Sequence, residues 1–157
     1  MDARPDIINS PVISSEWDIF WEEVPELTKG MESRETLVFT LPVAAGSADF
    51  QQLQKIFQAC ELKEGDYNLI ELTTENGVSW LHLREVLRPR YVILFGIEPI
   101  QLGISAIFMP HQVNRFQDIC WIPTLSVSKL SEYPDIKKHL WNYGLKPVFV
   151  EKAFANI

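Results

Sequence analysis

The chain has 157 residues, of which 46% are hydrophobic and 22% are charged, and this composition is typical of one folded domain with an ordinary apolar core. Its formal net charge of −7 disfavours a general nucleic-acid-binding surface, because the mean field of the molecule repels a polyanion. The two cysteines, Cys60 and Cys120, fall within a helical and a strand pattern and predict reduced core thiols. The N-terminal sequence has no export pattern and no window approaches about 18 apolar residues, so we predict a cytoplasmic protein without a membrane span.

Residues 1–34 differ from the rest of the chain, and we interpret them as an N-terminal arm that precedes a domain of residues 35–157. Within this acidic, proline-containing arm, four apolar residues have the spacing of one face of a short amphipathic helix capped by Ser14 or Ser15: Trp17, Phe20, Trp21 and Val24. Two interpretations remain open, since the helix either packs on its own domain or docks on a partner. Two tryptophans on a terminal arm make good anchors, so these four residues are the predicted partner-binding set.

From residue 36 onward, strand and helix patterns alternate. Four apolar runs predict strands at residues 36–41, 67–72, 91–97 and 117–123. Three helices are predicted between or after them, with Ser47 and Ser79 as caps of the first two and with Pro134 at the start and Gly144 at the end of the third. The run 91–97 is nearly continuous in apolar residues, as a central strand of a parallel sheet requires. The sequence therefore predicts a three-layer α/β/α sandwich with a mostly parallel four-stranded sheet.

Residues that could carry chemistry do not form a known motif. The loop after the first strand, PVAAGS, contains Gly46 alone, and Gly96 and Gly103 have the wrong spacing for a phosphate loop. Three histidines lie far apart in the sequence, at His82, His111 and His139, and no serine or cysteine stands in a nucleophile motif. Glu98, just after the central strand, is the one carboxylate placed to reach a cleft, and a turn or cap role competes with a catalytic one. We predict no catalytic residue, no cofactor and no metal.

Two segments resemble the uracil-DNA glycosylase superfamily. LRPRYVILFGIEPIQLG is similar to its helix, central strand and glycine turn, and residues 122–146 are similar to its ending, with Pro123 and Trp141 matching the frame. The resemblance implies a uracil-DNA glycosylase-like fold. It does not extend to the chemistry, because Ile122 stands where the family has its histidine and Thr124 where it has its serine. The first-strand loop also has no carboxylate or amide before Asp49, whereas a base-flipping hydrolase needs a polar pocket.

The non-catalytic pattern resembles the psi subunit family of bacterial DNA polymerase III. The similarity covers residues 36–150 and consists of a hydrophobic frame that includes Pro123, Thr124, Leu125, Leu130, Leu140 and Trp141. That family bridges the clamp loader to the chi subunit and inserts an N-terminal arm into the loader, so the arm with Trp17, Phe20 and Trp21 corresponds to it by position. The resemblance implies a non-catalytic adaptor in bacterial DNA replication, with a clamp-loader or other replication subunit as its partner.

Two alternatives stand beside the adaptor. The first is a divergent glycosylase-fold hydrolase that acts on nucleic acid with Glu98 or His111, and the second is a domain that forms a homodimer through exposed aromatic residues. The side chains at the carboxyl ends of the strands separate the first alternative from the adaptor. Filling by Ile122, Thr124 and the loop 42–47 favours the adaptor, whereas a cavity lined by Glu98, His111 and Asn114 favours the hydrolase.

Overall fold

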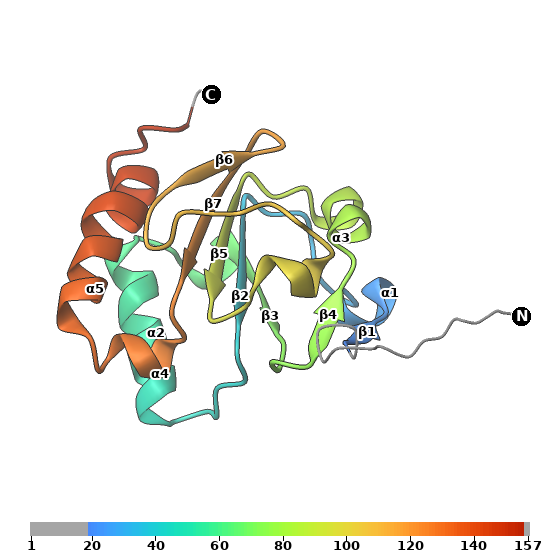
Figure 1. The fold of residues 1–157 in the computed structure, drawn as a ribbon, viewed down its shortest axis with the longest axis horizontal. Coiled ribbons are helices and arrows are strands. Elements are labelled where there is room, and N and C mark those ends of the chain that lie inside the picture. The colour runs from blue at the N-terminus through green and yellow to red at the C-terminus, as the bar shows by residue number, and fades with distance from the viewer. Residues whose placement is uncertain (1–18, 156–157) are drawn as a thin grey trace, which may run out of the picture.

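The computed structural model describes residues 19–155, and its centre is a five-stranded sheet with the order β3-β2-β5-β7-β6 (Figure 1). Four strands are parallel, as predicted: β2 (Thr36–Thr40), β3 (Tyr67–Glu71), β5 (Tyr91–Phe95) and β7 (Ile119–Thr124). The fifth, β6 (Asn114–Phe116), is an antiparallel edge strand that the sequence patterns did not predict. Gln117 and Asp118 join it to β7 with φ values of 55° and 62°, which is the backbone of a tight hairpin turn. For that reason β7 begins at residue 119 rather than 117.

Helices cover both faces of the sheet, so the protein is a mixed α/β fold with the layers of an α/β sandwich (Figure 1). One face packs against α2 (Ala48–Ala59), α4 (Val127–Leu130), α5 (Pro134–Leu140) and the π-type helix η4 (Trp141–Val150). The other face packs against α1 (Val24–Leu27), α3 (Trp80–Leu87) and the 3₁₀ turn η3 (Pro99–Leu102). A further 3₁₀ turn, η2 (Glu64–Asp66), precedes β3. Successive strand residues alternate between the two layers, as in Ile122 and Trp121 of β7.

The helix boundaries follow local signals with two exceptions. Ser79 stands at the N-cap position of α3 as predicted, but its side chain makes no cap hydrogen bond. The Oγ of Ser47 accepts a hydrogen bond from the backbone N–H of Phe50 at 3.1 Å, which confirms the predicted cap of α2. The prediction that Gly144 ends the last helix is wrong, because α5 continues into η4 as far as Val150. A Cβ on Gly144 would lie 3.0 Å from Cγ2 of Ile122, so this glycine allows the helix backbone to approach the sheet closely.

The N-terminal segment differs from the predicted amphipathic helix. Residues Phe20–Glu22 form a strand, β1, which pairs in parallel with β4 (Asn76–Val78) in a separate two-stranded sheet. The helical prediction is therefore wrong for these residues, and α1 begins only at Val24. The physical reason is that aromatic residues favour extended backbone where a neighbouring strand supplies hydrogen bonds, as the Glu75 carbonyl does for the Phe20 N–H at 2.8 Å. The predicted cap residues and Trp17 lie outside the described residues.

Both cysteines are free and buried, as predicted for core thiols. Burial raises the pKa of Cys60 to about 12, and it also raises the pKa of Cys120, against an opposing effect of the nearby Arg115. Among the described residues, no helix combines the length and the apolar character that crossing a membrane requires.

Candidate functional site

The first candidate is a set of exposed apolar side chains on and beside β1, namely Phe20, Trp21 and Ile100, which we call the β1 surface. Phe20 is 67% exposed, Trp21 is 53% exposed and Ile100 is 46% exposed. Trp21 and Ile100 line one groove together, whereas Phe20, the preceding strand residue, points to the other side of β1. Exposed apolar side chains gathered on one element mark contact sites more often than isolated ones do. Val24, which the helical spacing placed in the same set, packs in the core instead and is not available to a partner.

Trp21 lies between two shallow grooves on this surface. The first has a volume of about 630 Å³ and is lined by Ile19, Pro99 and Ile100 among others. The second has a volume of about 680 Å³ and extends from Trp21 over Leu81 of α3. Both grooves are open and largely apolar, so aromatic and aliphatic side chains are available on each side of the Trp21 ring.

Gln101, in η3, connects η3 with β4, the strand that pairs with β1. Its side chain is buried, and its Nε2 donates to the carbonyl oxygens of Thr73 and Asn76 at 2.8 Å each. Its Oε1 accepts from the backbone N–H of Glu98 at 3.1 Å. Because one amide fixes both the turn before β4 and the start of η3, β1 and Ile100 keep a defined relative position. No motif in the sequence marks Gln101, since only the tertiary fold makes it buried.

The second candidate is the mouth of the sheet, where the carboxyl ends of β2, β5 and β7 meet. The chain leaves β2 for β3 on one side and returns to β5 on the other, which is the point where open α/β sheets bind ligands. A cavity of about 470 Å³ lies there. Its apolar or small lining residues include Leu41, Gly96, Ile97 and Leu125, and its polar ones include Glu98, His111, Thr124 and Lys129.

His111 is a polar group at this mouth that both its side chain and its backbone hold in place. Its Nδ1 lies 2.9 Å from Oγ1 of Thr124 in a hydrogen bond, and its backbone N–H donates to the carbonyl of Pro123 at 2.7 Å. Burial lowers the pKa of His111, and the neighbouring His139, whose ring centroid is 6.4 Å away, lowers it further. The imidazole is therefore neutral at pH 7 and can accept or donate a hydrogen bond. Glu98 lies on the same cavity with an exposed carboxylate.

The mouth of the sheet matches neither the apolar filling expected of the adaptor nor the full polar lining expected of the hydrolase. Ile122 does not fill it, because its side chain is buried in the layer under α2, α4 and α5. Asn114 does not line it either, since its Oδ1 accepts from Met109 N at 2.8 Å and its Nδ2 donates to Met109 O at 2.9 Å. Glu98 and His111 do reach the cavity, and Thr124 binds His111. Of the predicted plug, only Thr124 lines the cavity, because Ile122 is buried elsewhere and the loop 42–47 is not part of the lining.

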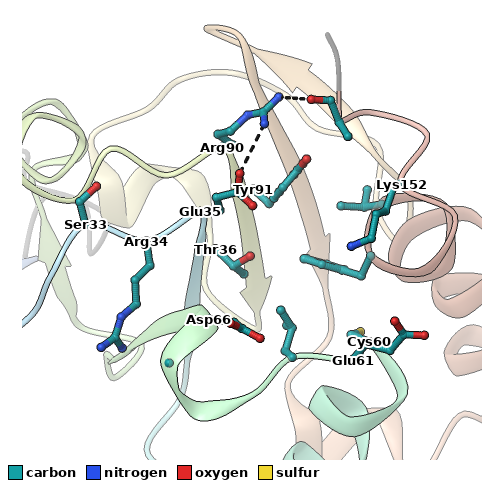
Figure 2. Close-up of a pocket in the computed structure, with 15 residues that line it drawn as sticks. Ser33, Arg34, Glu35, Thr36, Cys60, Glu61, Asp66, Arg90, Tyr91 and Lys152 are labelled. Atoms are coloured by element: carbon teal, nitrogen blue, oxygen red, sulfur yellow. Dashed lines mark hydrogen bonds and ion pairs between the residues drawn. The ribbon is translucent and has the colours of Figure 1, made fainter.

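A polar pocket of about 540 Å³ lies at the opposite, amino-terminal ends of β2 and β5, and Figure 2 shows its side chains. Arg90 dominates it, with Nη1 3.5 Å from Oε2 of Glu35 and Nη2 donating to the carbonyl of Ala155 at 2.6 Å. Arg34 donates to the carbonyl of Tyr67 at 2.9 Å. Because these two guanidinium groups already bind the protein's own acceptors, we assign them a structural role. Within residues 19–155, no three His, Cys, Asp or Glu side chains gather as a metal site.

No protein-family model matches the chain, and no curated protein matches it. The candidate sites therefore rest on their own geometry and chemistry.

Proposed function

We propose that this protein is a non-catalytic protein–protein adaptor that docks on its partner through the β1 surface. The observation that carries the proposal is the exposure of Phe20 and Trp21 on a strand that is hydrogen-bonded to β4 and braced by Gln101. Aromatic side chains presented by ordered backbone lose little conformational entropy on binding, which is why they dominate interface energetics.

The size of the anchors indicates how much of the surface a partner must cover. At about 150–250 Å² per aromatic side chain, the exposed parts of Phe20 and Trp21 leave roughly 240 Å² to bury, or about 6 kcal/mol gross at 25 cal/mol per Å². Association itself costs about 4–15 kcal/mol. The two rings alone therefore give weak binding at most, and a stable complex must also cover Ile100 and the grooves beside Trp21.

The resemblance to the psi subunit family supports a more specific form of the proposal. We propose a uracil-DNA glycosylase-like fold and a place in the bacterial cytoplasm, as an accessory subunit of the replicative polymerase clamp loader. The mostly parallel sheet with helices on both faces is compatible with this fold. In the resembled family the N-terminal arm meets the loader, and here the N-terminal arm, residues 1–34, carries Phe20 and Trp21.

The experiment is capture of partners from native bacterial lysate with the tagged full chain. We expect clamp-loader or other replication subunits to be retained by the native chain and lost when Phe20→Ala and Trp21→Ala are combined. Tyr133→Ala is the matched control, because Tyr133 is also an exposed aromatic but lies at the start of α5, on the opposite layer. Undiminished capture by the double variant would contradict the proposal, and capture of the chain alone would favour the homodimer.

The mouth of the sheet supports a second candidate function, a divergent glycosylase-fold hydrolase acting on nucleic acid. The supporting observation is the cavity that Glu98 and His111 line together, with a neutral imidazole available for proton transfer. Release of free base from a uracil-containing single-stranded oligonucleotide tests it. Activity that is lost in both Glu98→Gln and His111→Gln would replace the adaptor as the proposed function.

A further inference from the structure

A small groove lies between α2 and the helices at the end of the chain, on the layer opposite the β1 surface. Figure 1 shows α2 and α5 side by side on one face of the sheet, whereas β1 lies beyond the other face. The groove has a volume of about 240 Å³, and buried Ile56, Leu140 and Leu145 take part in its lining. Pockets for small organic ligands are commonly about 300–1,000 Å³. This groove is smaller and apolar, so it suits a single large side chain.

One polar group in this groove has no partner. The Nε2 of Gln52, on α2, is buried and makes no hydrogen bond with any part of the described chain. Leaving a buried donor unsatisfied costs about 1–3 kcal/mol, so such a group calls for an explanation. In the described structure the surrounding chain covers this nitrogen, so an acceptor supplied from outside, such as a peptide carbonyl, can bind it once the Gln52 side chain turns outward.

The walls of the groove carry two positive charges. Lys55 of α2 and Lys137 of α5 stand on its two sides and are both exposed. Neither forms an ion pair with another residue of the stretch 19–155. The chain as a whole has a net charge of −7, whereas the charged residues that line this groove are both positive. They favour an occupant with negative charge next to its apolar group.

We propose that this groove binds an acidic peptide segment of a partner protein. One large apolar side chain of the segment fills the groove, carboxylates beside it face Lys55 and Lys137, and a backbone carbonyl accepts from Gln52. Because the sheet separates the groove from the β1 surface, both can be occupied at once. The inference goes beyond the adaptor function, since peptide binding here requires nothing of β1.

The test is fluorescence polarisation of the full-length protein with two fluorescein-labelled octapeptide pools. In the first, Leu or Phe is flanked by Asp and Glu, and in the second the acids are replaced by Lys and Arg. We expect the acidic pool to bind at least about tenfold more tightly, a difference of about 1.4 kcal/mol. An acidic pool with Ala in place of Leu or Phe should bind more weakly, because it leaves the groove empty. Equal binding of the three pools would overturn the proposal.

Substitutions in the groove test whether the peptide binds there. Lys55→Glu combined with Lys137→Glu should weaken acidic-pool binding at least about tenfold, and Ala59→Trp should block the groove. The charge control is Lys29→Glu combined with Lys63→Glu, at two exposed lysines outside the groove, and it should bind normally. Binding that survives the groove variants would overturn the proposal.

Two further variants distinguish peptide binding at the groove from a loss of stability and from binding at the β1 surface. Gln52→Leu should raise the melting temperature, because it removes the unsatisfied donor, while it weakens peptide binding. Phe20→Ala with Trp21→Ala should leave peptide binding intact, so failure at one surface is distinguishable from failure at the other. A Gln52→Leu protein that is less stable and binds peptide as well as the native chain would contradict the role assigned to Gln52.

Discussion

Gly77→Ala is expected to loosen β1 from the domain. Gly77 lies in β4, and a Cβ there would lie 2.6 Å from the carbonyl oxygen of Gln101 and 2.6 Å from Cγ2 of Ile19. The Ile19 side chain can rotate away. The Gln101 carbonyl cannot, because two hydrogen bonds from the side chain of Gln101 hold its residue against the turn before β4. The added methyl group must therefore separate β4 from η3.

The cost follows from this contact. Overpacking of a well-packed site costs about 1–3 kcal/mol, and alanine recovers about 0.4–1 kcal/mol by restricting the unfolded chain. A net loss of about 1–2 kcal/mol corresponds to a melting temperature lower by roughly 2–8 °C in a domain of this size. The control is Gly65→Ala, because a Cβ on Gly65 meets nothing within 4 Å and the backbone there does not have positive φ. That variant should be as stable as the native protein or slightly more stable.

Thermal unfolding followed by circular dichroism gives the stability difference, and hydrogen exchange gives its location. The Phe20 N–H, which donates to the Glu75 carbonyl, should exchange faster in Gly77→Ala, whereas amides of β5 should not change. Partner capture through Trp21 should weaken in parallel. If the two alanine variants melt at the same temperature and exchange alike at residues 19–23, the inferred contact between β4 and η3 does not constrain β1.

Three further predictions concern single groups. Ser47→Ala should cost about 1 kcal/mol in urea unfolding, because its Oγ caps α2, whereas Ser79→Ala should cost less, because the Ser79 side chain makes no cap hydrogen bond; equal losses would contradict this difference. The folded-state pKa of His111 is lowered, so the unfolded chain binds the extra proton and stability should fall as pH drops below about 6.5. His139→Gln should raise the His111 pKa in an NMR titration, and an unchanged value would remove the proposed interaction. The Cys60 thiol, with a pKa of about 12, should resist a thiol reagent at pH 8 until the protein unfolds, and rapid labelling of the native protein would contradict its burial.

The parallel strands were predictable because a buried strand has a recognisable apolar run in the sequence. All five residues of β2 and of β5 are buried, and a strand covered on both faces needs a continuous apolar run. The three-residue strands β1, β4 and β6 have no such pattern. Each depends on a neighbour supplied by the tertiary fold, so a local reading of Phe20 and Trp21 as helical could not anticipate their strand.

The candidate sites were less predictable than the fold. Glu98 is recognisable as a carboxylate after the central strand, and it does reach the mouth of the sheet. His111 has no motif, and it reaches the same cavity because its backbone takes a φ of 63° and its side chain meets Thr124. Phe20 and Trp21 were selected by a helical spacing that the structure does not have, and Val24, which the same spacing grouped with them, is buried in the core. The groove beside Gln52 depends on how two distant helices pack, which no sequence period records.

The strand order has a consequence for how the protein can be made on the ribosome. Of the strands in the five-stranded sheet, β2 emerges first, and it lies between β3 and β5 in the finished sheet. After β3 has paired on one side, β5 adds at the opposite edge; β6 emerges next and β7 after it, so the two pair as a hairpin and β7 takes the place beside β5, with β6 at the outer edge. Translation can thus proceed without opening a completed strand pairing. The hydrogen bond from Arg90 to the carbonyl of Ala155 forms after all five strands have been made.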